Sequence, residues 1–259
     1  MKQYIKPVLK SFGFIALFVL INTIIFGVYF IASGTQDLEN ISPNAMTVIL
    51  IATQLIVLLI ILLIYNKQFI SKVRFGKISP KILLWAFLIG LGGLSISGIL
   101  IGTMQIIFPN QMASYIDSIE GGIGGANVLI SFIAVVILAP LVEEIAMRGM
   151  LFRWFEKTNI KPWMLIILSG LFFGIFHLNL IQGVFTFVIG IMYALGFYMT
   201  KSLWVPIVMH FANNALAMTM GYLPDAIIEA QLFTIISYLM IVLIPIGFYI
   251  IRKELRNQA

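Results

Sequence analysis

The stretch VLISFIAVVILAPLVEEIAMRGMLF, residues 128–152, is apolar and long enough to cross a bilayer, which takes about 20 residues. Its second half nevertheless holds the charged residues Glu143, Glu144 and Arg148. A charge at the centre of the hydrocarbon is unfavourable by about 2.5–3.5 kcal/mol, so such side chains usually face a cavity or a partner. The stretch therefore predicts a membrane helix that presents polar groups to the protein interior.

The composition of the whole chain also indicates a membrane protein. Of 259 residues, 61% are hydrophobic and 10% are charged, whereas a soluble domain is roughly 45–50% apolar and about 25% charged. The chain has no cysteine, which excludes a disulfide framework, a thiolate metal site and a cysteine nucleophile. The net charge of +6 comes from short basic clusters between apolar segments, so it indicates topology and not binding of nucleic acid.

We expect an all-α, polytopic helix bundle with about eight transmembrane helices in one integral membrane domain, residues 1–259. Residues 11–32 exceed the apolar length of a signal peptide, so we interpret them as a retained first helix. The fifth and sixth apolar segments are the shortest. The eight segments lie at 11–33, 44–65, 81–108, 128–152, 162–178, 182–200, 203–221 and 231–251.

The charged residues predict the orientation. All 16 Lys and Arg residues fall in segments 1–10, 66–81, 148–161, 201–202 and 252–259. The intervening loops carry only acids, which are Asp37, Glu39, Asp117, Glu120, Asp225 and Glu229. Because basic loops stay in the cytoplasm, we expect a multi-pass protein of the cell membrane with both termini inside.

Three glycine patterns indicate a loop or a close contact between helices. The Gly-rich segment 121–125 lacks the Lys-Ser/Thr of a phosphate loop and is expected to be a flexible loop. Gly98 and Gly102 have GxxxG spacing, which favours close helix packing. Gly170, Gly174 and His177 fall on one helical stripe, so His177 should face the bundle.

The intramembrane ionisable residues are Glu143, Glu144, His177 and His210. Glu144 and Arg148 are four residues apart and can pair, whereas Glu143 is rotated by about 100° and is left free. A tight hairpin at 157–163 would bring Glu143 and His177 to the same depth. The alternative for His177 is a histidine satisfied by a backbone carbonyl.

The seventh segment contains His210 and Asn214, four residues apart on one face, with Asn213 beside them. Asn side chains often serve only to form hydrogen bonds between membrane helices, without a catalytic role. His210 also lies closer to the cytoplasmic side than His177. A sixth helix shortened by an irregular turn inside the membrane would reduce this mismatch.

These polar groups favour hydrolysis by an activated water. The chain lacks Gly-x-Ser-x-Gly and His-Glu-x-x-His, which disfavours a serine elbow and the commonest zinc protease. A carboxylate can deprotonate water, while His and Asn side chains stabilise an oxyanion. Two histidines and one carboxylate could also form a catalytic zinc site, with Glu143, His177 and His210 as ligands.

Three motifs resemble the CAAX-protease and bacteriocin-processing family of intramembrane proteases, in the family's order. They are EEIAMR at 143–148, FGIFH at 173–177 and HFANN at 210–214. The resemblance covers residues 127–221. It implies that Glu143 activates water, that Glu144 is the structural partner of Arg148, and that His177, His210 and Asn214 bind water, the oxyanion or a metal. Phe173 matches the Phe of the second motif. A zinc site and a metal-free mechanism both stay open.

The leading interpretation is an intramembrane endopeptidase that processes a peptide or a lipidated or membrane protein at the cytoplasmic side. The basic segment 148–161 would attract anionic lipid headgroups or an acidic substrate there. The alternative is a non-enzymatic bacteriocin-immunity protein or membrane scaffold of the same family. A transporter with a proton relay is disfavoured, because the polar groups are confined to the fourth to seventh segments.

Overall fold

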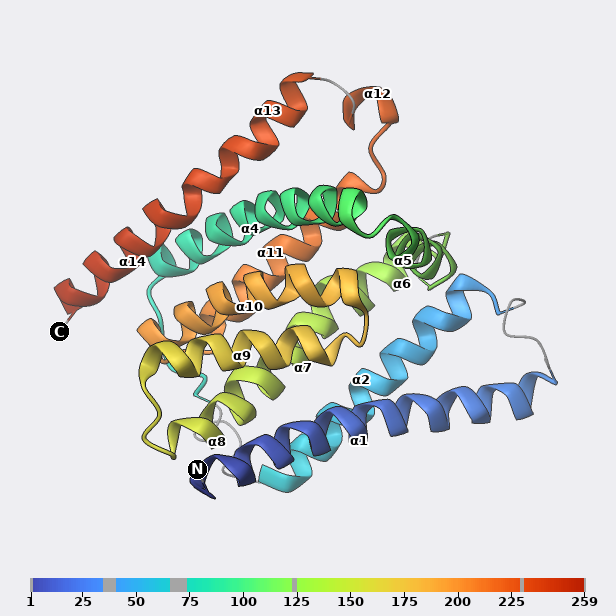
Figure 1. Cartoon of the computed structure of the whole chain (residues 1–259), viewed down its shortest axis with the longest axis horizontal. Coiled ribbons are helices and arrows are strands. Elements are labelled where there is room, and N and C mark those ends of the chain that lie inside the picture. Colours follow the sequence, from blue (N-terminus) through green and yellow to red (C-terminus); the bar gives the residue numbers. More distant parts are fainter. Residues whose placement is uncertain (1, 35–40, 66–73, 123–124, 229–230, 259) are drawn as a thin grey trace.

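A computed structural model describes residues 2–34, 41–65, 74–122, 125–228 and 231–258. All regular structure in these ranges is helical, which confirms the all-α class (Figure 1). Four helices begin at a proline, whose fixed φ and missing N–H suit the first helical position. These four are α2 (Pro43–Tyr65), α4 (Pro80–Ile107), α5 (Pro109–Gly122) and α9 (Pro162–Phe176).

The other helices complete a bundle in which α9, α10 and α11 lie in the middle of the view (Figure 1). The first helix is α1 (Lys2–Ser33), and the inner helices are α10 (Leu180–Thr200) and α11 (Trp204–Met220). The chain ends with α12 (Asp225–Ile228), α13 (Gln231–Leu239), the 3₁₀ turn η5 (Met240–Val242) and α14 (Leu243–Gln258). Residues 128–156 form one long helix, which we call the interrupted helix because two π-helical segments interrupt its α-helical geometry. Its parts are α6 (Val128–Ser131), η3 (Phe132–Leu138), α7 (Ala139–Glu144), η4 (Ile145–Leu151) and α8 (Phe152–Glu156).

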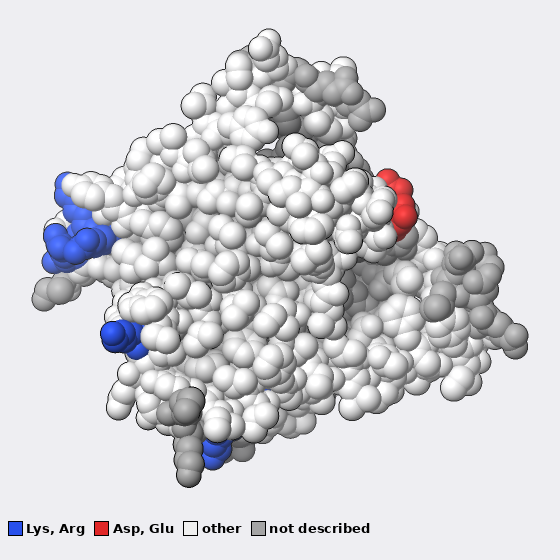
Figure 2. Space-filling model, in the orientation of Figure 1, with Lys and Arg blue, Asp and Glu red and all other residues white. Residues whose placement is uncertain are grey.

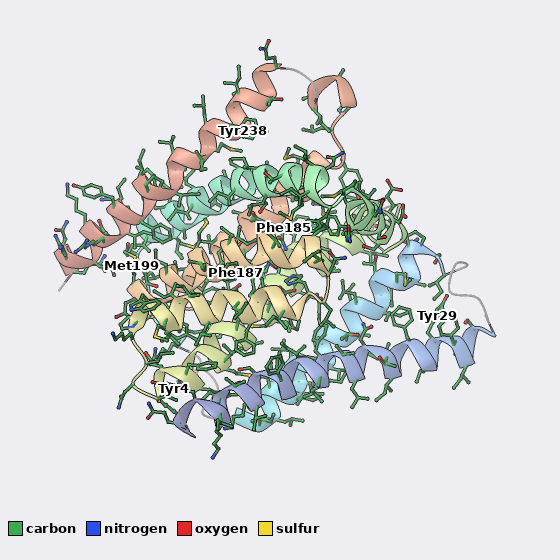
Figure 3. The ribbon with its side chains drawn as sticks, in the orientation of Figure 1. Tyr4, Tyr29, Phe185, Phe187, Met199 and Tyr238 are labelled. Carbon is green, nitrogen blue, oxygen red and sulfur yellow. The ribbon has the colours of Figure 1, made fainter. Side chains whose placement is uncertain are left out.

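The protein is a multi-pass membrane protein. Within the described ranges, six helices are long and apolar enough to cross a bilayer, at 3–33, 43–64, 80–107, 128–156, 180–200 and 234–258. The outer helices expose large apolar side chains, as lipid-facing helices do, with Ile31 86% exposed and Leu63 70% exposed. Figure 3 shows such side chains along α1 and along α13 and α14, where Tyr238 projects from the bundle.

The predicted count of eight spans is not confirmed. Helix α9 has 15 residues and α11 has 17, so both are shorter than the length that normally spans. The shortened sixth helix considered in the sequence analysis is not found, because α10 runs over 21 residues. The short helix is instead α9, which begins only after the turn at 157–161.

Charge divides the molecule into two ends. We call the end bearing Arg74, Lys157 and Lys201 the basic end, and the end bearing Asp117 and Glu120 on α5 the acidic end. Figure 2 shows the Lys and Arg atoms on one side of the molecule and the acidic atoms on the other. Both termini lie at the basic end (Figure 1), as expected for termini on one side of the membrane. The charged residues at positions 37, 39, 67, 72 and 229, which were also assigned to a side of the membrane, lie outside the described residues. Positions 123 and 124 of the Gly-rich segment lie outside them as well.

A polar cluster ties the loops together at the basic end. Arg74 donates to both carboxylate oxygens of Glu156, at 3.3 and 2.8 Å, and Lys201 Nζ lies 3.7 Å from Glu156 Oε1. Burial lowers the pKa of Lys201, and the neighbouring Glu156 carboxylate opposes that shift. Ser202 Oγ donates to the Gly76 carbonyl at 3.0 Å. The turn between α10 and α11 is thereby fixed to the segment before α4.

Glycines allow the inner helices to approach closely. A Cβ on Gly170 would lie 2.7 Å from the Phe187 carbonyl, and one on Gly174 would lie 2.6 Å from the Gly183 carbonyl. The predicted stripe of small residues therefore packs α9 against α10. The same prediction was wrong for Gly98 and Gly102, because a Cβ there would meet nothing within 4 Å. The close contact of α4 is made by Gly90, where a Cβ would lie 2.1 Å from the Met209 carbonyl of α11.

Candidate active site

The backbone of residues 128–156 is widened on both sides of the Glu143–Glu144 pair by the π-helical segments η3 and η4. Pro140 explains the first of these, since it has no N–H to donate to the Val135 carbonyl, while the Ala139 N–H bonds to the Ala134 carbonyl. The Val135 carbonyl is thus left without a helical donor. Asn214 Nδ2 of α11 donates to it at 2.9 Å. A π-helical turn therefore binds the predicted site residue Asn214.

The predicted ion pair between Glu144 and Arg148 forms inside the protein. Both residues are fully buried, and Arg148 Nη1 lies 2.9 Å from each oxygen of the Glu144 carboxylate, donating to Oε1. Arg148 Nη2 donates to the Gly190 carbonyl of α10 at 2.6 Å. The guanidinium carbon also lies 4.9 Å from the centroid of the Phe173 ring. Arg148 therefore links three helices around Glu144.

Glu144 also orients His210, a contact that the sequence did not predict. His210 is 5% exposed, and its Nδ1 lies 3.1 Å from Glu144 Oε1. A carboxylate accepts hydrogen bonds, so Nδ1 is the protonated nitrogen and Nε2 is available on the other side of the ring. The Tyr193 ring stacks on His210 at 5.1 Å between centroids. The imidazole is therefore held on one face and at one edge.

His177 is held in the same way by backbone. It caps α9, and its Nδ1 lies 2.9 Å from the Phe173 carbonyl, which can only accept. The carbonyl contact considered in the sequence analysis is thus present, and it leaves Nε2 available for chemistry. The fully buried Phe173 ring contacts both imidazoles edge to face, with centroids 5.0 Å from His177 and 5.6 Å from His210. The two histidines therefore meet at one ring despite their different positions along the helices.

Glu143 remains without a hydrogen bond to another described side chain. Its Oε2 is buried and has no partner among the described residues. It interacts electrostatically with His210, Glu144 and Arg148, while His177 interacts with His210. His210 is thus the common neighbour of Glu143 and His177. A buried carboxylate oxygen without a partner is unfavourable, and its usual explanation is a water or a ligand that the oxygen binds.

The donor set does not form a preorganised metal site. In the described ranges, no three His, Asp or Glu side chains are grouped closely enough to hold a metal ion. The expected ligands Glu143, His177 and His210 therefore do not fit a zinc ion in this arrangement.

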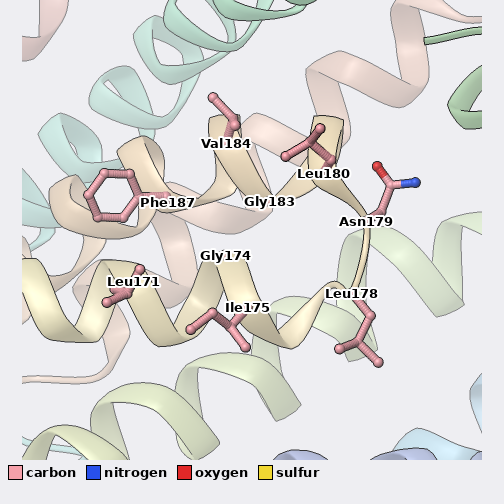
Figure 4. A pocket seen from close by; sticks show the side chains of 9 residues that line it. All are labelled: Leu171, Gly174, Ile175, Leu178, Asn179, Leu180, Gly183, Val184 and Phe187. Atoms are coloured by element: carbon pink, nitrogen blue, oxygen red, sulfur yellow. The ribbon is translucent and has the colours of Figure 1, made fainter. Parts of the chain in front are cut away.

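A cavity of about 400 Å³ reaches this site from the acidic end. It lies between α5, η3 and α11, and Asn214 and Val135 form part of its wall. A second apolar cavity, of about 450 Å³, lies between α9 and α10 beside Gly174 and Gly183 (Figure 4). None of the predicted site residues lines that second cavity. The Asn214 cavity is therefore the one that bears on chemistry.

Three contributors were missed in the sequence, namely Tyr193, Gly190 and the Val135 carbonyl. Pro140, within the predicted helix, was a partial signal for the last of these, because proline removes a helical donor, but only the π-helical register of η3 makes the freed carbonyl that of Val135. Gly190 carries the carbonyl bound by Arg148, and a Cβ there would lie 2.9 Å from the Phe173 ring. No spacing rule pairs Tyr193 with His210, since the contact depends on how α10 and α11 pack.

Comparison with known proteins supports the family suggested by the motifs. Residues 125–216 match the family described as "Type II CAAX prenyl endopeptidase Rce1-like". A Bacillus subtilis (strain 168) protein named "Putative membrane peptidase YdiL" is 29% identical over 145 residues, which is 51% of this chain and 59% of that protein. No solved structure matches the chain. The matched segment contains every motif residue from Glu143 to Asn214, which confirms the family resemblance.

Proposed function

We propose, from the match of residues 125–216 to the family described as type II CAAX prenyl endopeptidase Rce1-like, that the protein is an intramembrane endopeptidase. It hydrolyses a peptide bond with a water activated by Glu143, and it processes a peptide or a membrane protein. The observation that carries the proposal is the Glu143 carboxylate, whose Oε2 is buried without a partner among the described residues and which interacts electrostatically with the oriented His210.

Each site residue has one role in the reaction. Glu143 accepts a proton from water, and the resulting hydroxide attacks the carbonyl carbon of the scissile amide. The negative charge then develops on the carbonyl oxygen, where the second N–H of Asn214 is a donor, while the Nε2 atoms of His177 and His210 accept hydrogen bonds from the attacking water. Glu143 finally gives its proton to the leaving nitrogen. Glu144 and Arg148 do not react, but they fix the His210 ring.

The test compares peptides released by membranes containing either the wild-type chain or Glu143→Gln, read by mass spectrometry. Products present only with wild type are expected, since an amide cannot accept the proton. Glu254→Gln is the matched control, because Glu254 lies on α14 outside the site, where it pairs with Lys81 of α4, and its loss should leave the products unchanged. Cleavage retained by Glu143→Gln would refute the role of Glu143.

The same membranes separate the remaining alternatives. A metal-free mechanism predicts that a zinc chelator leaves product formation unchanged within about twofold. A loss that added zinc reverses would instead assign a metal to the site. If neither wild type nor Glu143→Gln released any product beyond those of membranes that lack the chain, with both chains inserted, the immunity or scaffold function would be favoured.

A further inference from the structure

The cavity beside Asn214 has the features of a binding site and not only of loose packing. Its wall comes from separate parts of the chain, with Tyr115 and Ile119 on α5, Ser131 and Val135 on the interrupted helix, and Asn214 on α11. His210 lies one helical turn deeper than Asn214 on the same face of α11. A chain that entered the cavity would thus pass Asn214 before it reached the catalytic histidine.

Ser131 supplies an independent sign of a ligand. Its side chain is 3% exposed, lines the cavity, and its hydroxyl has no hydrogen-bond partner among the described residues. Hydroxyls in apolar helices normally bond to the carbonyl four residues earlier. Thr47, Thr53 and Thr186 of this chain do so at 2.8, 2.9 and 2.7 Å. The Ser131 hydroxyl is therefore available to a polar group inside the cavity.

The charges around the cavity favour a cation. Asp117 and Glu120 are exposed on α5, the helix that contributes Tyr115 and Ile119 to the wall. The basic residues that precede and follow α5 most closely in the sequence are Lys81 and Arg148. Lys81 lies at the basic end, where it pairs with Glu254 of α14. Because opposite charge raises the local concentration of a ligand, the acidic end attracts basic peptides and repels acidic ones.

We propose that this cavity is the entrance and binding subsite for the substrate, and that it takes a peptide segment carrying a basic residue from the acidic end. The proposal rests on the proposed peptidase function and names its substrate class. The substrate then approaches from the side of the membrane opposite to the basic loops, which replaces the cytoplasmic approach and the acidic substrate expected from the sequence. Ser131 and Asn214 would donate to carbonyl groups of the peptide backbone, while Asp117 and Glu120 would hold its positive charge near the mouth.

The experiment uses the absence of cysteine from the natural chain. Ser131→Cys is nearly isosteric and introduces the only thiol. Cells expressing it are treated from outside with membrane-impermeant thiol reagents, one cationic and one anionic, and each rate is divided by that reagent's rate with free cysteine. We expect Ser131→Cys to react from outside, with the cationic reagent faster by about threefold or more at low salt.

Three comparisons make the result specific. Adding Asp117→Asn and Glu120→Gln should remove the preference for the cation without removing the reaction. A short lysine-containing peptide should slow labelling, whereas its glutamine counterpart should not. The matched control is Ser169→Cys, because Ser169 is also fully buried with an unpaired hydroxyl but lies outside the cavity wall, and it should not react.

The proposal would be overturned if Ser131→Cys reacted only in inverted vesicles, or if both reagents reacted equally. Should Ser131→Cys fail to insert, Met218→Cys in the same cavity wall gives the same test. Labelling requires no cleavage, so its outcome is separate from that of the peptidase test. Products without cation-selective labelling would leave the peptidase standing and remove the subsite, and the reverse pattern would leave a peptide-binding protein.

Discussion

Tyr193 is the buried residue whose chemistry is least explained by packing. Its ring stacks on His210, and it is fully buried, yet its hydroxyl has no hydrogen-bond partner among the described residues. Buried tyrosine hydroxyls usually find a partner. Because the ring lies within electrostatic range of Glu143, Glu144 and Arg148, the hydroxyl can donate to the attacking water or to the oxyanion.

Tyr193→Phe should therefore reduce kcat while leaving stability nearly unchanged. The ring, the stacking on His210 and the packed volume are all retained, and only the unpaired hydroxyl is removed. Loss of one oxyanion donor lowers kcat by about 10²–10³-fold. The measurement is kcat and KM on a fluorogenic peptide derived from the identified product, together with the unfolding temperature. An unchanged kcat would restrict Tyr193 to a packing role.

Substitution of Glu144 should mainly lower the stability of the protein, in contrast to Tyr193→Phe, which should mainly lower kcat. Glu144→Gln would leave Arg148 charged, buried and without its counter-ion, and breaking such a pair is destabilising by about 3–5 kcal/mol. We expect a large fall in the unfolding temperature of the purified protein in detergent. Adding Arg148→Met to Glu144→Gln should recover part of this loss, since no charge then remains unpaired. Equal stability of Glu144→Gln and wild type would contradict the buried pair.

At the scale of elements, α4 positions α11 through one glycine. A Cβ on Gly90 would lie 2.1 Å from the backbone carbonyl of Met209, the residue before His210. A backbone atom cannot rotate away as a side chain can, so the two helices would have to separate. Gly98 on the same helix has nothing within 4 Å of its Cβ position. Comparing substitutions at Gly90 and Gly98 therefore separates the effect of the contact between α4 and α11 from the effect of helix propensity.

Gly90→Ala should destabilise the protein by about 1–3 kcal/mol and lower the rate of cleavage, because it displaces His210. Gly98→Ala should be neutral or should stabilise by up to about 1 kcal/mol, as alanine favours the helix. Unfolding of both variants can be followed by tryptophan fluorescence, with kcat measured in parallel. Similar effects of the two substitutions would show that α4 and α11 are not in close contact at Gly90.

Helix periodicity explains which parts of the site could be predicted. Glu144 with Arg148, and the stripe of Gly170 and Gly174, follow from spacing within one helix, and both occur in the structure. The contact between Glu144 and His210 joins residues 66 positions apart, so it depends on helix packing that no local pattern encodes. The prediction of close packing at Gly98 and Gly102 failed for a related reason. GxxxG spacing shows that one face of a helix carries only small residues, but it does not show whether another helix packs against that face.

At the scale of the whole molecule, the number of crossings depends on α9 and α10. Helix α10 has 21 residues and is about 31 Å long, which matches the hydrocarbon thickness. Only three residues separate it from the end of α9, so the turn at 177–179 lies at the same depth for both helices. Because α9 starts only after the turn at 157–161, its 15 residues need not cover the full thickness to bring the chain to the acidic side.

We therefore predict eight crossings, which single cysteines in this cysteine-free chain can test. Asn159→Cys, in the turn before α9, should react with an impermeant maleimide only in inverted vesicles, because the basic end faces the cytoplasm. Leu178→Cys and Tyr222→Cys should react from outside, since these side chains are 66% and 54% exposed at the opposite end. If Leu178→Cys reacted from neither side while Tyr222→Cys still reacted from outside, the α9–α10 turn would lie within the bilayer. Helices α9 and α10 would then form a re-entrant hairpin, leaving six crossings with both termini still inside.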